Sequence, residues 1–109
     1  MRLSQKEEQA LNRFKEYAID QMGSEILSIR LFGSKARGTA RRNSDVDVLV
    51  VTQHDDWKLK DKIGAIATDI LLDSGVYLSL KVFGKAFHNR LLKVGSPFIR
   101  NVQREGILL

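Results

Sequence analysis

The chain has 109 residues, of which 43% are hydrophobic and 28% are charged, with a formal net charge of +5. This length fits one domain over residues 1–109 and is too short for two, and the absence of cysteine excludes disulfides and cysteine-based zinc sites. No apolar run reaches membrane-spanning length, and the first residues lack the apolar core of a signal peptide. We therefore expect a cytoplasmic protein without membrane association. The positive charge favours anionic partners such as nucleotides, RNA or an acidic protein surface.

The first half of the chain predicts alternating helical and extended segments. Ser4 and Glu7 have the spacing of a capping box, and apolar residues then recur at helical spacing. The run that ends before Gly33 is typical of a strand, and the apolar residues that follow Asp47 favour a strand buried on both faces. In chain order we expect a helix over 4–21, a strand over 26–32, one helical turn over 34–38, a polar loop over 39–44 and a strand over 45–51.

The second half predicts three helices and one more strand. A stripe of leucines and isoleucines indicates a helix over 57–72, and a strand over 76–83 follows it. Residues 85–94 favour a helix, and Ser96 and Pro97 have the residue types of an N-cap and a first turn in a last helix that Gly106 ends. The order predicts an α/β (α+β) fold, with a small mixed sheet of about three or more strands flanked by helices.

Two aspartates, Asp45 and Asp47, open the most strand-like run of the chain. Residues two apart on a strand point to the same face, so the two carboxylates are expected about 6–7 Å apart along the chain. Like charges that close repel each other unless a cation lies between them. Carboxylate oxygens suit Mg²⁺, which binds through one or two carboxylates plus substrate phosphates. The pair therefore predicts a Mg²⁺ site, although a turn residue beside a solvated strand residue is the simpler alternative.

A second motif, Gly33-Ser34-Lys35-Ala36-Arg37-Gly38, ends the preceding strand. A Gly-Ser turn can offer backbone N–H groups and a hydroxyl to phosphate, and a helix that starts there favours anions. Glycine and serine are also common in ordinary turns. Arg37 lies between this turn and the polar loop, where it can fix the loop or contact phosphate, and Lys35 is similar.

These two motifs together resemble the minimal nucleotidyltransferases of the DNA polymerase beta superfamily. The family pattern is G-S followed by A-R-G, a polar loop and S-D-x-D, which here reads Gly33-Ser34, Ala36-Arg37-Gly38 and Ser44-Asp45-Val46-Asp47. The resemblance implies transfer of a nucleoside monophosphate, AMP from ATP or another NTP, to a protein or RNA acceptor. It implies that Gly33, Ser34 and Arg37 bind the nucleotide and that Asp45 and Asp47 hold two Mg²⁺ ions. It further implies a HEPN-domain partner in a toxin–antitoxin pair.

The chain departs from the family pattern at a third carboxylate, which the family carries on a later strand. The corresponding strand here reads Val-Tyr-Leu-Ser-Leu-Lys-Val over 76–82 and contains no acid. Either Asp73 reaches across to the site, or one metal ion suffices, or catalysis is weak or lost. The last case is a binding subunit that neutralises a partner protein by contact. A simple RNA-binding domain is a third alternative. The sequence does not decide whether the protein forms homo-oligomers.

Overall fold

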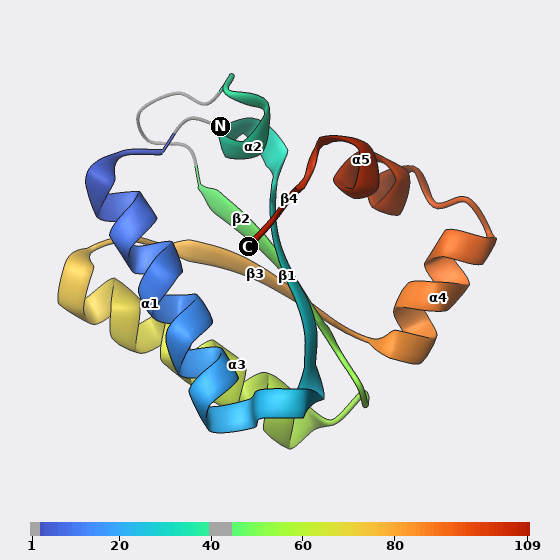
Figure 1. The fold of residues 1–109 in the computed structure, drawn as a ribbon, viewed down its shortest axis with the longest axis horizontal. Coiled ribbons are helices and arrows are strands. Elements are labelled where there is room, and N and C mark those ends of the chain that lie inside the picture. Colours follow the sequence, from blue (N-terminus) through green and yellow to red (C-terminus); the bar gives the residue numbers. More distant parts are fainter. Residues whose placement is uncertain (1–2, 40–44) are drawn as a thin grey trace.

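The computed structural model describes residues 3–39 and 45–109, and it shows helices packed on a small twisted sheet (Figure 1). The predicted loop residues 40–44 lie outside the described part. In chain order the elements are α1 (Gln5–Met22), a 3-10 turn η1 (Gly23–Glu25), β1 (Ile26–Phe32), α2 (Gly33–Arg37), β2 (Val46–Thr52), α3 (Trp57–Ser74), β3 (Leu78–Gly84), α4 (Lys85–Lys93), α5 (Pro97–Glu105) and β4 (Ile107–Leu108).

The sheet has the strand order β3-β2-β1-β4. β1 pairs antiparallel with both β2 and β4, whereas β2 and β3 run parallel and are connected through α3. The sheet is therefore mixed, as the sequence predicts.

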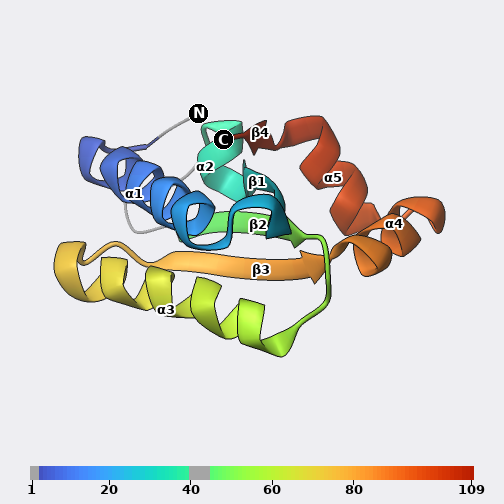
Figure 2. The ribbon, with the colours of Figure 1, turned by 60° about the horizontal axis from the view of Figure 1, so that its bottom comes forward.

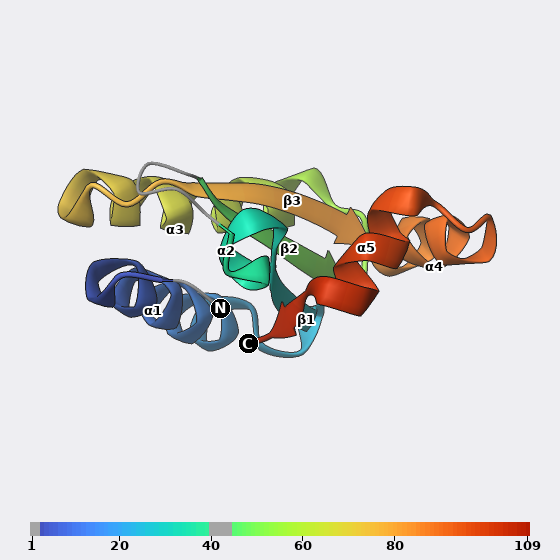
Figure 3. The ribbon, with the colours of Figure 1, turned by 90° about the horizontal axis from the view of Figure 1, so that it is seen from above.

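One face of the sheet, here called the first face, carries the main hydrophobic core. α1 and α3 both pack there, with Phe14 and Ile63 fully buried between the helices and the strands. Every second residue of β2, among them Val48 and Val50, points into this core. Figures 2 and 3 show α1 and α3 grouped together, apart from α4 and α5.

The opposite side of the sheet, here called the second face, carries a smaller apolar cluster. Leu49 and Val51 of β2 pack there against Ile99 and Val102 of α5, with partly buried aromatic residues around them. Burial of successive residues 48–51 of β2 on alternating faces confirms the prediction of a strand buried on both sides.

The structure corrects several predicted boundaries. β2 begins at Val46, so Asp45 precedes the strand and only Asp47 lies within it. β3 is displaced to 78–84, and α3 extends to Ser74 because its C-terminal cap is Gly75 in the left-handed region. Ser96 occupies the N-cap position of α5 but makes no side-chain capping hydrogen bond. β4 has no counterpart among the predicted elements.

Candidate active site

The predicted site residues meet where β1 ends and β2 begins. Asp47 lies on the second face, directly paired with Phe32 of the antiparallel neighbour β1. Gly33 follows Phe32 and starts α2, so the turn of the Gly-Ser motif is adjacent to the carboxylate. Asp45 is exposed at the entrance to the same strand. The register of one strand pair therefore brings together two motifs that are separated in the chain by the polar loop.

Gly33 packs directly against the carboxylate of Asp47. Its φ of +75° lies in the left-handed region, and a Cβ added there would overlap Oδ2 of Asp47 and stand 3.2 Å from its Cγ. Any larger residue would therefore have to displace the carboxylate and would also strain the backbone. The left-handed φ and this contact together favour glycine at the start of the motif.

The electrostatics of Asp47 show that the two carboxylates interact. Its pKa is raised above the ordinary value, first by partial burial and then by the negative charge of Asp45. The positive charges of Lys81 and Arg37 and a hydrogen bond with Ser79 act in the opposite direction but do not cancel these effects. The ionised form of Asp47 is thus less favourable than that of a free aspartate, and a cation beside it would oppose this effect.

The remaining residues of the Gly-Ser motif form α2, a helix of five residues. Ser34 lies half-buried in its first turn, and Phe32 at the N-cap position provides no side-chain hydrogen bond to that turn. The hydroxyl of Ser34 and the backbone N–H groups of the turn are the donors closest in sequence to Gly33.

Arg37 connects α2 to the C-terminal helix. Its Nη1 donates to Oε2 of Glu105 at 3.3 Å, and its side chain remains partly exposed. A pocket of about 200 Å³ lies beside this pair. It is lined by Phe32, Gly33, Arg37, Phe98, Asn101, Val102 and Glu105. Arg37 therefore borders both the carboxylate site and a small pocket against α5.

Lys35, by contrast, lies away from the site. Only 3% of the residue is exposed, and its Nζ pairs with Oε2 of Glu7 at 2.9 Å. Burial by itself would raise the pKa of Glu7, but hydrogen bonds from the Ser4 backbone and from Lys35 leave it lowered. Lys35 thus fastens α2 to the first turn of α1, where Ser4 and Glu7 form the predicted capping box. The prediction that Lys35 resembles Arg37 is wrong, because the ammonium group of Lys35 is buried in an ion pair with Glu7.

The β3 side of the site has no acid. Ser79 is the parallel partner of Asp47, and Lys81 follows two residues later. Asp73, the nearest acid before the strand, instead accepts from Nη1 of Arg13 on α1 at 2.7 Å. Within residues 3–39 and 45–109, no group of three or more histidine, cysteine, aspartate or glutamate side chains could hold a metal ion.

Comparison with known proteins agrees with this geometry. The family model described as a nucleotidyltransferase domain matches residues 9–106. The chain belongs to this nucleotidyltransferase family. It is 34% identical over 103 residues to a candidate protein adenylyltransferase, MJ0604, of Methanocaldococcus jannaschii, a match that covers 94% of this chain and 97% of the relative.

Solved structures show the same nucleotidyltransferase fold. A candidate minimal nucleotidyltransferase superimposes with a TM-score of 0.58 at 24% identity, over 93% of this chain and 94% of the other. A mutant form of the toxin–antitoxin MntA-HpeT gives a TM-score of 0.52 at 19% identity, over 87% and 68% of the two chains. The fold and the family resemblance predicted from the sequence are confirmed, and the chain is classed as an enzyme.

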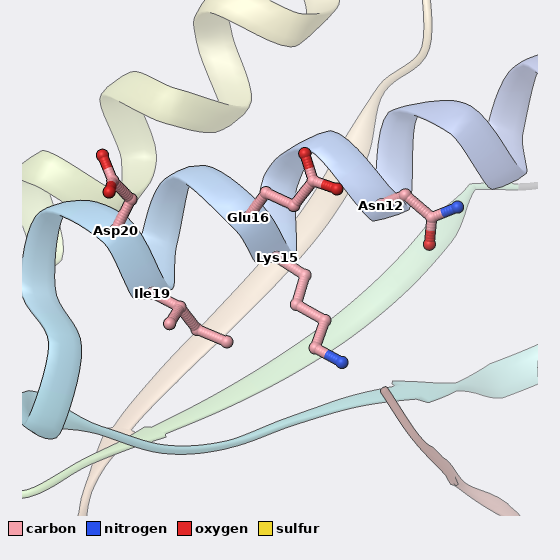
Figure 4. A pocket seen from close by; sticks show the side chains of 5 residues that line it. All are labelled: Asn12, Lys15, Glu16, Ile19 and Asp20. Atoms are coloured by element: carbon pink, nitrogen blue, oxygen red, sulfur yellow. The ribbon is translucent and has the colours of Figure 1, made fainter.

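A second hollow on this nucleotidyltransferase lies elsewhere. It is lined by one helix alone, α1, through Asn12, Lys15, Glu16, Ile19 and Asp20, whose side chains spread over the helix surface (Figure 4). None of these residues belongs to the predicted motifs.

Among the described residues, no helix combines the length and the apolar character that a bilayer crossing requires.

Proposed function

We propose that this nucleotidyltransferase transfers AMP from ATP to a protein acceptor in a reaction that requires Mg²⁺. The observation that supports the proposal is the contact of Asp47 with Gly33, since this carboxylate then lies next to the Gly-Ser turn, whose backbone N–H groups and hydroxyl can donate to phosphate. Carboxylates and nucleotide phosphates together form the usual protein environment of Mg²⁺. Residence in the cytoplasm goes with this proposal because ATP is the substrate.

The residues present fit a divalent ion. Asp45 and Asp47 supply hard oxygen ligands, and burial, followed by the negative charge of Asp45, raises the pKa of Asp47. Bound there, the ion would supply charge neutralisation at the reacting phosphate. The expected step is attack of an acceptor hydroxyl oxygen on the α-phosphorus. A new P–O bond forms, the bond to the β-phosphate breaks, pyrophosphate leaves with the electron pair and the hydroxyl proton passes to solvent.

The chain's other site residues would bind and orient the nucleotide. Gly33 and Ser34 offer backbone and hydroxyl donors to the triphosphate, and Arg37 adds positive charge at the end of the same short helix. Such preorganised donors lower the barrier most where they face developing negative charge. We assign these residues to nucleotide binding and the two aspartates to metal binding.

A protein is the favoured acceptor because a relative covering almost the same length is described as a candidate protein adenylyltransferase. A structural relative is a toxin–antitoxin assembly, MntA-HpeT. We propose that this chain is the antitoxin-type member of such a pair and modifies a HEPN-domain partner. RNA is the second acceptor that the basic charge allows.

Labelled ATP tests the reaction. With Mg²⁺ and a HEPN-domain protein from the same genome, label in the α-phosphate should enter the partner protein, whereas label in the γ-phosphate should not. Asp45→Asn/Asp47→Asn should abolish transfer, and Asp61→Asn, an exposed acid on α3, is the matched control that retains it. Absence of transfer by the wild type, or equal transfer by the double variant, would remove the proposal. Label in added RNA instead of protein would reassign the acceptor.

The alternative is a non-catalytic subunit. The observation that favours it is that Ser79, and not an acid, pairs with Asp47 on the strand where the family carries its third carboxylate. Such a subunit would neutralise its partner by contact alone. The double asparagine variant would then still neutralise the partner in a growth assay. Loss of neutralisation by this variant, with the complex intact in size-exclusion chromatography, would count against the alternative.

A further inference from the structure

The polar residues of β2 and β3 form one continuous surface on the second face. Asp47 pairs with Ser79, and Leu49 pairs with Lys81 two register positions further along the strands. Residues two apart on a strand point to the same face, so Ser79 and Lys81 lie on the side of Asp47. Leu78 and Leu80, which alternate with them, belong to the core on the first face. β2 and β3 can be followed side by side in Figure 1.

This surface is positively charged on the β3 side of the carboxylate pair. Ser79 carries no charge, and Lys81 is exposed rather than held in an ion pair between the described residues. Lys81 lies one same-face position beyond Ser79, the residue of β3 that pairs with Asp47. An ammonium group in this position repels a divalent cation and attracts phosphate oxygens.

The charge balance therefore differs on the two sides of Asp47. On the side of Asp45 a second carboxylate is available as a metal ligand. On the side of β3 a serine hydroxyl and an ammonium group are available, and these are donors suited to an anion. The side of Asp45 therefore suits a divalent ion. The side of β3 suits the phosphate oxygens of a triphosphate whose negative charge the ion does not fully neutralise.

We propose that Lys81 is a nucleotide-binding residue whose ammonium group contacts the phosphates from the β3 side, and that the carboxylate pair holds a single divalent ion. This inference rests on the proposed function, because it assigns Lys81 to the same nucleotide site. The positive charge of the Lys81 ammonium group replaces that of a second metal ion in neutralising the negative charge of the triphosphate.

Binding measurements test the proposal without turnover. The wild-type protein is saturated with α,β-methylene-ATP and Mn²⁺, and the Mn²⁺ and nucleotide retained per protein are counted after equilibrium dialysis. We expect one Mn²⁺ and one nucleotide. Lys81→Met should weaken nucleotide affinity by about tenfold or more, since a hydrogen bond to a charged group is lost, and Lys81→Arg should restore most of it.

Lys62→Met serves as the matched control, because Lys62 is an exposed lysine on α3 and α3 covers the other face of the sheet. Its nucleotide affinity should stay at the wild-type value, and thermal unfolding should show that both methionine variants are folded. Two Mn²⁺ ions per wild-type complex, or unchanged affinity in Lys81→Met, would overturn the inference while the proposed function stands. A wild-type protein that binds no nucleotide would overturn the proposed function and the inference together.

Discussion

The two faces of the sheet are built from the same strands but serve different purposes. On the first face the strand residues are mostly apolar and α1 and α3 pack on them, although Leu80 and Val82 of β3 remain partly exposed. On the second face the apolar cluster under α5 gives way to Asp47, Ser79 and Lys81. Because strand residues alternate between faces, a single strand can stabilise the fold with one set of side chains and present charge with the other. Substitutions on the first face should therefore change the free energy of unfolding, and substitutions on the second face should change nucleotide and metal binding.

The largest effect should come from the first face. Phe14→Ala removes a fully buried ring between α1 and the sheet, and we expect the free energy of unfolding to fall by about 3–5 kcal/mol. Urea denaturation at constant temperature measures the loss. The folded fraction should bind nucleotide as the wild type does, and impaired binding by fully folded protein would contradict the separation of the two faces.

A smaller loss is expected where α1 meets the Gly-Ser motif. Lys35→Met leaves Glu7 partly buried without its cation, which should reduce the free energy of unfolding by about 2–3 kcal/mol. Adding Glu7→Gln should recover part of the loss because no unpaired charge remains. The folded pKa of Glu7 is lowered, so its stabilising contribution is complete above its ordinary pKa and disappears as the pH falls through the folded pKa. Equal acid sensitivity of wild type and Glu7→Gln would refute this pairing.

A still smaller effect is expected for the ion pair between α1 and α3. Asp73→Asn removes the partner of Arg13, but both side chains are substantially exposed. The free energy of unfolding should change by at most about 1 kcal/mol. Metal and nucleotide binding should not change, as calorimetric titration would show. Weakened metal binding would mean that Asp73 reaches the site after all.

The smallest change in stability, and one of opposite sign, is expected at Asp47. Its folded pKa is raised, so the folded state retains the proton more strongly, and stability should decline as the pH rises from the ordinary pKa through the folded pKa. Asp47→Asn should therefore unfold at a slightly higher temperature than the wild type at neutral pH without divalent ions. Mg²⁺ should narrow the difference by stabilising only the wild type. A lower unfolding temperature of the variant would disprove the interpretation.

The sequence predicts the elements that have a clear period or cap. The capping box at Ser4 and Glu7 begins α1, and the apolar run after Asp47 forms a strand buried on both sides. The proximity of Gly33 to Asp47 was also predictable, because a strand ending at the motif and a strand starting at the aspartates suggest neighbouring strand ends. These features are local, or they follow from a single strand pairing.

Features that depend on tertiary context were not predictable. β4 consists of two residues, too few to show a period, and it forms only because α5 returns the chain to β1. The burial of Lys35 depends on Glu7, which lies 28 positions earlier in the chain. That Ser79 rather than Lys81 lies directly beside Asp47 follows only from the register of a parallel strand pair separated by α3.

The short strand β4 links the end of α5 to the edge of the sheet at β1, beside the proposed nucleotide site. Ile107 pairs with Leu31, and the backbone N–H of Leu109 donates to the carbonyl of Ile29 at 2.9 Å. This anchor holds the end of α5, where Glu105 pairs with Arg37. A change that breaks the pairing of β4 with β1 would therefore also displace Glu105 and release the guanidinium group of Arg37 that it holds.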